Sequence, residues 1–91
     1  MKHTLYGNAV TRSVALDGIP LDPRRSQEHW NHSPDGFNWG YNGSGPAQLA
    51  LAVFLQLFDS AKGYQDFKSE VISKLPIGED FEIEFELEAP A

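Results

Sequence analysis

The chain has 91 residues, no cysteine and a net charge of −6 at pH 7, and 41% of its residues are hydrophobic. This composition excludes a disordered chain, the missing cysteines exclude disulfides and thiolate zinc sites, and the length supports one core, so we expect a single domain over residues 1–91. The excess of acids argues against direct binding of DNA or RNA, because such binding depends largely on Lys and Arg displacing counterions.

Two strand-like segments at the N-terminus, residues 4–6 and 9–16, predict the first part of a sheet. The dipeptide Asp17-Gly18 that follows is a strong signal for a tight hairpin turn. It would return residues 19–21 beside the end of the second segment. The prolines in and after this returning segment make it a short strand or place it at an edge of the sheet.

Residues 22–45 are rich in Pro, Gly, Asn, Ser and His, which is typical of a loop. The stretch also carries large aromatic residues that can anchor a loop against a core, namely Trp30, Phe37, Trp39 and Tyr41. Over residues 37–41 the aromatic residues alternate with smaller ones. This period of two predicts a short strand whose aromatic side chains share one face.

A long helix is predicted next, over residues 47–58. Gly45 would be its N-cap, Pro46 fits the first helical position, and Gln48 stands where a capping-box side chain reaches back. Apolar residues cover nearly the whole circumference of this segment. A helix that is apolar all round is buried on most sides, so we expect it to be the central helix of the fold.

A second helix is predicted over residues 61–74, with an apolar stripe on one side and Pro76 after its end. The last element is a strand over residues 81–88 in which apolar and acidic residues alternate. Its inner row comprises Phe81, Ile83, Phe85 and Leu87, and its outer row comprises Glu82, Glu84, Glu86 and Glu88. Together these elements predict an α+β fold, with two helices packed on one face of a small antiparallel sheet.

The most specific pattern of the chain lies in residues 30–52, which read W-N-H-S-x-D-G-F-x-W-G-Y and then G-S-G-P-A-Q-L-A-L-A. A second pattern, Y-Q-x-F-K-x-E-V-I-x-K-L-P, spans residues 64–76. Together they resemble an uncharacterised family of small proteins from phages, plasmids and bacteria, a domain of unknown function. The chain departs from the family pattern at Asn42, where a glycine is expected. The resemblance implies a shared fold and a phage-like context.

The glycine-rich segment before the central helix is a candidate anion site. Unpaired backbone N–H groups and the positive end of the helix dipole meet there, and glycines allow a ligand to approach closely. A nucleotide or phosphate would then stack on loop aromatics and pair with an arginine. The predicted ligand-binding residues are Gly43, Ser44, Gly45, Trp39, Tyr41 and Arg25. The segment lacks the lysine of a P-loop, and its glycines are also explained by a tight turn.

His29, His32 and Asp35 offer nitrogen and oxygen ligands within one loop, but their spacing matches no zinc signature. A nucleophile built from Ser33 or Ser44 with His32 would lack a nucleophile elbow. Hydrogen bonds that stabilise the loop explain the same residues. We therefore expect no catalytic residue, no metal and no cofactor.

The outer glutamates of the last strand belong to a group of six acids that follow Lys74 without an intervening base, so the excess charge is concentrated at the C-terminus. A row of like charges has two explanations. It protects an edge strand from aggregation, or it forms an acidic surface that occupies a nucleic-acid-binding groove on another protein. The predicted partner-binding residues are Glu82, Glu84, Glu86 and Glu88 with Trp30 and His32.

Two function hypotheses follow. The first is a small, acidic, non-catalytic binding protein, a phage or mobile-element counter-defence inhibitor that occludes a host protein such as a CRISPR effector. The alternative is a sequestering protein that binds a nucleotide or another anion at the glycine-rich helix start. Neither a signal peptide nor an apolar segment long enough for a membrane is present, so we expect a cytoplasmic protein without membrane contact. A monomer and a homodimer are both compatible with the sequence.

Overall fold

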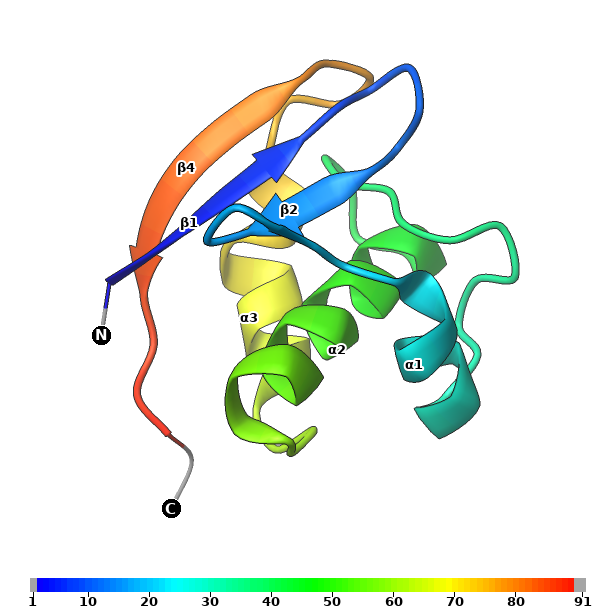
Figure 1. The fold of residues 1–91 in the computed structure, drawn as a ribbon. Coiled ribbons are helices and arrows are strands. Elements are labelled where there is room, and N and C mark those ends of the chain that lie inside the picture. Colours follow the sequence, from blue (N-terminus) through cyan, green and yellow to red (C-terminus); the bar gives the residue numbers. More distant parts are fainter. Residues whose placement is uncertain (1, 90–91) are drawn as a thin grey trace.

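The computed structural model describes residues 2–89 and shows a four-stranded antiparallel sheet with three α-helices in this range. The strands are β1 (Lys2–Gly7), β2 (Val14–Leu16), β3 (Ile19–Pro20) and β4 (Phe81–Glu86), in the order β3-β2-β1-β4. The helices are α1 (Pro23–His29), α2 (Ser44–Phe58) and α3 (Tyr64–Glu70), and α3 is followed by the 3-10 turn η1 (Ile72–Lys74). All helices lie on one side of the sheet (Figure 1). The predicted α+β class is confirmed, and α1 is a third helix that we did not predict.

The predicted hairpin is present, with Ala15 opposite Pro20 and Leu16 opposite Ile19. Its turn residues have positive φ, 52° at Asp17 and 79° at Gly18, as a type I′ turn requires. β2 is shorter than predicted, because residues 8–13 form a loop instead. The amide oxygen of Asn8 accepts hydrogen bonds from the backbone N–H groups of Val10 and Thr11, which replaces ladder pairing with a local turn.

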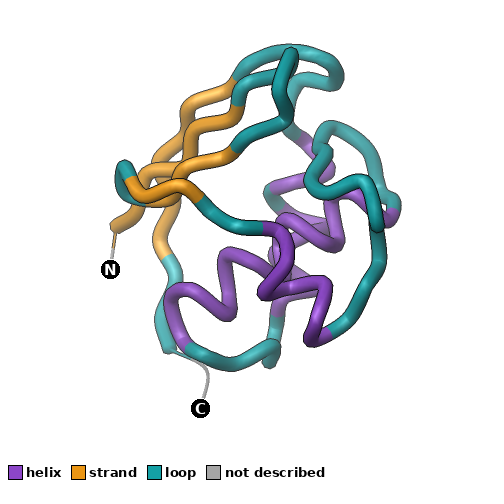
Figure 2. Tube along the Cα trace, turned by 45° about the vertical axis from the view of Figure 1, so that its right-hand side comes forward, coloured by secondary structure: helices purple, strands orange, loops and turns teal. Residues whose placement is uncertain are grey.

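β1 and β4 bring the two ends of the described chain together, with β1 inside the sheet and β4 at its edge. Their antiparallel pairing runs from Lys2 opposite Glu86 to Gly7 opposite Phe81. The period of two predicted for β4 is confirmed. The acidic side chains are exposed, whereas the alternate apolar ones are buried or half-buried against the core. Figure 2 shows the sheet as one layer and the helices as the other.

α2 is the central helix, as predicted, and every residue from Gly45 to Leu55 is buried. It begins at Ser44 with Gly43 as N-cap, so the predicted start at residue 47 and the predicted Gly45 cap are wrong by a few positions. The capping box is wrong too, because the Gln48 side chain turns away from the helix end and is fully buried.

No strand forms over residues 37–41, contrary to our prediction. Gly40 has a φ of 86°, which interrupts an extended backbone, and its N–H donates to the carbonyl of Ile72 rather than to a strand. Phe37 and Trp39 point into the core, and the Trp39 indole N–H donates to the carbonyl of Glu79. The alternation of aromatics therefore reflects anchoring of a loop.

The helices that flank α2 also differ from the prediction in their bounds. α1 starts inside the segment predicted to be a loop, where the Asp22 carboxylate caps the N–H of Arg24 and Pro23 occupies the first helical position. The helix predicted over residues 61–74 is interrupted, because Val71 leaves helical geometry between α3 and η1.

Candidate functional site

Side chains of the preceding loop pack against the two glycines at the start of α2, although Ser44 between them is exposed. A Cβ atom added at Gly43 would lie 2.6 Å from Cε2 of Tyr41, and one added at Gly45 would lie 2.6 Å from Cβ of Asn38 and 3.0 Å from the Tyr41 hydroxyl. The two glycines thus allow Tyr41 and Asn38 to pack over the helix start. The anion-site hypothesis requires that the fold brings together Tyr41, Gly43, Ser44 and Gly45, and it does so. Tyr41, however, packs directly against the two glycines.

Arg25 and Trp39 do not complete that site. Arg25 donates to Oδ1 of Asp59 at 2.6 Å, and Asp59 is the C-cap of α2, so the guanidinium lies about 20 Å from the helix start. Trp39 is 1% exposed and offers no free face for stacking. The six predicted ligand-binding residues therefore do not form one site, and anion binding at the start of α2 stays a prediction.

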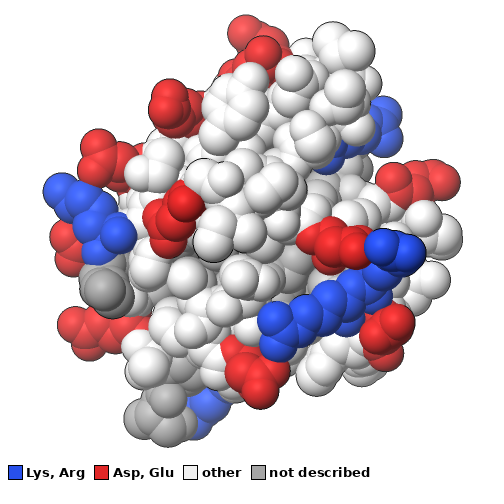
Figure 3. Space-filling view, viewed as in Figure 1, with Lys and Arg blue, Asp and Glu red and all other residues white. Residues whose placement is uncertain are grey.

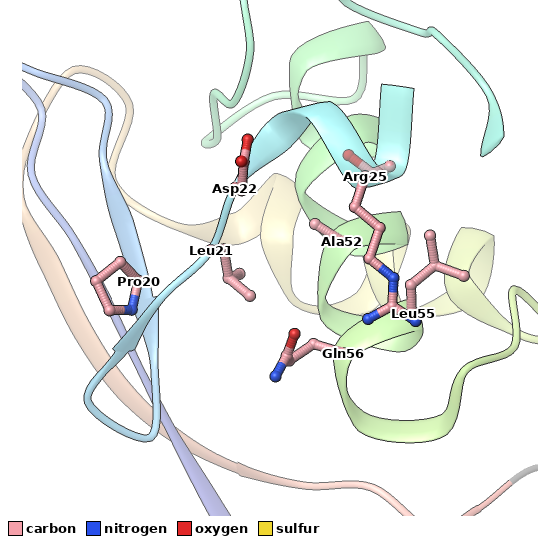
Figure 4. Close-up of a pocket in the computed structure, with 8 residues that line it drawn as sticks. Pro20, Leu21, Asp22, Arg25, Ala52, Leu55 and Gln56 are labelled. Carbon is pink, nitrogen blue, oxygen red and sulfur yellow. The ribbon is translucent and has the colours of Figure 1, made fainter. Parts of the chain in front are cut away.

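Arg25 instead borders a cavity of about 120 Å³ between β3, α1 and α2. Figure 4 shows the Arg25 side chain extending from α1 to lie beside Leu55, while Leu21 and Ala52 contribute apolar groups to the lining. Pockets for drug-sized ligands usually enclose about 300 Å³ or more, so this cavity is too small for a nucleotide. Its other charged residue, Asp22, is paired with Arg24.

Trp30, His32 and Tyr64 form an aromatic cluster on the helical side of the molecule. The His32 ring stacks on Trp30, with 5.6 Å between ring centroids, and its Nε2 lies 2.8 Å from the Tyr64 hydroxyl. Burial, followed by the positive charge of Lys68, lowers the pKa of His32. Trp30 is 63% exposed, so the cluster presents an aromatic face to solvent.

The other members of the predicted histidine loop do not join this cluster. His29 and Asp35 are exposed, and within residues 2–89 no group of three or more acidic or histidine side chains is arranged to hold a metal ion. Ser33 is held through its backbone, whose N–H donates to Oε1 of Gln48 at 2.9 Å. No hydrogen bond in the described range links Ser33 or Ser44 to His32.

Gln48 explains much of the polar pattern before α2, and its role differs from the capping role that we predicted. Besides accepting from Ser33, its side-chain amide donates to the Ser26 hydroxyl at 2.8 Å and to the Trp30 carbonyl at 3.1 Å. Ser26, also fully buried, donates in turn to the carbonyl of Pro23. This buried network fastens α1 and the following loop to α2, so these motif residues have a structural function.

The outer face of the sheet is the acidic surface of the molecule. Glu82, Glu84 and Glu86 point outward from β4, and within residues 2–89 no helix covers them. Figure 3 shows Asp and Glu side chains gathered along the margin where β4 lies. Among the described residues, one ion pair forms on this face, between Nζ of Lys2 and Oε2 of Glu84 at 3.8 Å. Glu88 is exposed beyond the end of β4.

Tyr6 lies beside this acidic row. It is paired with Glu82 across the β1–β4 ladder and is 43% exposed. We did not predict a role for Tyr6, although its place in a strand that alternates with buried residues is a signal for an outward side chain. The acidic face therefore combines carboxylates with one aromatic side chain.

A second exposed surface lies at the loop end of the sheet and was also missed. Val10 is 92% exposed and Ile77 is 64% exposed, and Ile77 and Tyr41 border a cavity of about 150 Å³. Arg12 also lines this cavity. Its backbone has a positive φ of 60°. Single apolar residues in loops are common on protein surfaces, so no sequence signal marks this group.

No helix in the described part of the chain is long and apolar enough to cross a membrane. A family model described as a family of unknown function, DUF6166, matches residues 2–88. The comparison with curated proteins gave no match, and the comparison with solved structures gave none.

Proposed function

This chain belongs to the DUF6166 family, whose function is unknown, and we propose that it is a non-catalytic protein that binds a basic surface of another protein. The observation that carries the proposal is the uncovered outer face of the sheet. Three glutamates of β4 share that face with one lysine and one exposed tyrosine, Tyr6. The partner is expected to contribute Lys or Arg side chains.

Repulsion between the glutamates gives this face a reason to bind a basic surface. Glu82, Glu84 and Glu86 lie at alternate positions of one strand, and like charges so close together repel each other. Among the described residues, Glu84 alone of the three forms an ion pair, and that pair is exposed and of small value. A basic partner surface would relieve the repulsion and accelerate association through long-range attraction. Tyr6 supplies an aromatic group of the kind that is enriched at binding hot spots.

The finer proposal is a counter-defence inhibitor from a phage or another mobile element. A protein surface that binds nucleic acid is basic. An acidic face that covers such a surface would keep nucleic acid from binding, and the host protein that we propose is one of this kind, such as a CRISPR effector. The resemblance of residues 30–52 to proteins of phages and plasmids supports this context. Trp30 is the C-cap of α1 and His32 contacts Tyr64 of α3, so both fall outside the footprint that we propose.

The test is affinity purification of the tagged protein from lysate of a bacterial host, followed by native mass spectrometry. We expect the wild-type chain to retain a protein partner and the variant E82Q/E84Q/E86Q to lose it. The matched control is E28Q/D66N/E70Q, which removes the same number of acids from exposed positions elsewhere. This control should retain the partner, because only the location of the charge differs.

Two results would contradict the proposal. If the β4 variant keeps its partner, or if both variants lose it equally, the acidic face is not the binding surface. An added mass of a few hundred daltons in place of a protein, retained by the β4 variant and lost in the variant S44E, whose exposed carboxylate would repel an anion at the helix start, would favour the anion-binding alternative.

A further inference from the structure

The two edges of the sheet differ in how open they are. β3 is a strand of two residues that contains Pro20, so it offers little backbone for pairing. β4 is the opposite edge strand, has six residues and contains no proline. An edge strand of this length presents backbone N–H and C=O groups that a further strand can bind.

The register of the sheet identifies which residues carry these open groups. Thr4 bonds toward β2, since its carbonyl accepts from the N–H of Asp17 at 2.8 Å and its N–H donates to the Asp17 carboxylate at 2.9 Å. Successive residues of an antiparallel strand direct their backbone groups to opposite neighbours. Leu5 therefore bonds toward β4, and its partner Ile83 bonds back toward β1.

It follows that Glu82, Glu84 and Glu86 direct their backbone N–H and C=O groups to the free edge, which we define as the edge of β4 opposite β1. No backbone hydrogen bond from a loop or helix within residues 2–89 reaches these groups. The residues that carry the outward charges are thus the same ones that carry the open backbone groups.

The side chains along the free edge specify the kind of strand that fits. On the outer side lies the acidic row, and on the inner side Ile83 and Phe85 are only half-buried although they pack against the core. Beyond the end of β4, Leu57, Phe58 and Leu87 border an open groove of about 410 Å³. A strand with basic residues on one face and apolar residues on the other would match both sides.

A second copy of this chain does not match. If two β4 strands paired edge to edge with their inner faces on the same side, each acidic row would continue into the other, and like charges in neighbouring strands destabilise a sheet. The acidic row therefore disfavours pairing of the free edge with a second copy of the chain and favours pairing with a basic segment.

We propose that the free edge of β4 binds an extended segment of a partner protein in which basic and apolar residues alternate, so that the segment becomes a fifth strand of the sheet. The basic side chains pair with the acidic row, and the apolar side chains cover Ile83 and Phe85. This inference rests on the proposed function and specifies its partner as a strand-forming segment.

The experiment uses the full chain and a synthetic probe, the capped hexapeptide Lys-Val-Lys-Val-Lys-Val. Its control is Lys-Lys-Lys-Val-Val-Val, which has the same composition but cannot separate its charges and apolar groups onto two faces. In NMR titrations we expect the alternating peptide to bind about tenfold or more tightly than the control. The shifted amides should centre on residues 82–86, with cross-strand contacts between peptide and β4 backbones.

A backbone variant separates the edge from the charge. Ligation of synthetic segments can introduce N-methyl Glu84, which keeps the carboxylate but removes an N–H that points away from β1. We expect this chain to keep its thermal stability and to bind the alternating peptide about tenfold less tightly. E84Q tests the charge alone and should weaken binding while the strand contacts persist.

The outcomes distinguish the inference from the function on which it rests. If E82Q/E84Q/E86Q loses the peptide while N-methyl Glu84 binds it normally, the partner contacts the acidic face and the strand-addition inference is wrong. Equal binding of the two peptides leads to the same conclusion. If neither the glutamate variant nor the N-methyl variant changes peptide affinity, the proposed function is overturned as well.

Discussion

The segment that leads into α2, residues 30–48, and the strand β4 are opposites in sequence and in structure. The first carries a specific motif, and its polar groups are used inside the fold, where Gln48 accepts from the Ser33 N–H and donates to the Ser26 hydroxyl. The second is a plain alternation of Glu with apolar residues, and its outer side chains are almost without partners. A distinctive motif can therefore serve folding, while a simple pattern marks the surface left for binding.

The two regions differ in whether their polar and charged side chains have partners within the chain. Within residues 2–89, no buried side-chain nitrogen or oxygen lacks a hydrogen bond, so the helical side offers no orphan polar atom to a ligand. On the sheet side, Glu82 and Glu86 form no ion pair in the described range. Substitutions in the first region should act on stability, and substitutions in the second should act on binding.

The largest effect is expected from Gly40→Ala. A Cβ atom there would lie 2.5 Å from the backbone Cα of Ile77, and the φ of 86° disfavours any side chain. We expect a loss of about 3 kcal/mol or more in the free energy of unfolding, measured by urea denaturation. Gly18→Ala is the control, because its φ is also positive but no atom lies within 4 Å.

The control should lose only about 1 kcal/mol. Equal losses in both variants would show that the loop near Ile77 adjusts and that Gly40 is not needed for close packing.

The next largest effect is expected from Gln48→Ala, about 2–3 kcal/mol, because it leaves buried partners in α1 and the following loop without a hydrogen bond. Gln56→Ala is the matched control on the exposed side of the same helix and should change stability by less than about 0.5 kcal/mol. Chemical denaturation gives both values. A stable Gln48 variant that has lost partner binding would reverse the roles that we assign to the two regions.

A smaller, pH-dependent effect is expected at His32, whose pKa is lowered by burial. Above the ordinary value of 6.5, both the folded and the unfolded chain hold a neutral ring, so this residue adds no pH dependence. Below 6.5 the unfolded chain takes up a proton that the folded chain resists. Stability is therefore lost as the pH falls toward the folded pKa and then levels off.

His32→Gln should flatten this part of the curve of unfolding free energy against pH, whereas Asn31→Gln, at an exposed position without a titratable group, should leave it unchanged. A wild-type curve that does not differ from that of His32→Gln below pH 6.5 would show that the ring is as well solvated in the folded chain as in the unfolded one.

The smallest change in stability is expected from E82Q/E84Q/E86Q, which removes repulsion along β4. We expect the free energy of unfolding to stay constant or to rise by about 0.5 kcal/mol, with the gain disappearing at high salt. Unfolding curves at low and high ionic strength measure this. A loss of more than about 1 kcal/mol would mean that the glutamates stabilise the fold, so that no binding role is needed to explain them.

Much of the fold could be predicted because single elements carry strong local signals. The Asp17-Gly18 turn, the all-round apolar α2 and the alternation in β4 each depend on neighbouring residues only. The predicted strand at residues 37–41 failed because long-range contacts decide there. Gly40 bonds to Ile72, far along the chain, and no local pattern encodes that pairing.

The candidate site was predicted less completely. Alternation placed the acidic row on the outer face, but it could not show that Arg25 pairs with Asp59 rather than with a ligand at the start of α2. The Asp22-Pro23 cap signal for α1 is present in the sequence, but the loop-like composition of residues 22–45 outweighs it locally. Which backbone groups of β4 stay open depends on the register with β1, and only the folded sheet defines that register.

The most direct test of the account is amide hydrogen exchange of the chain with and without its captured partner. We predict new protection at residues 82–86 and unchanged exchange over residues 30–48. Protection confined to residues 30–48, with β4 exchanging as in the free chain, would contradict the claim that the acidic strand is the binding surface.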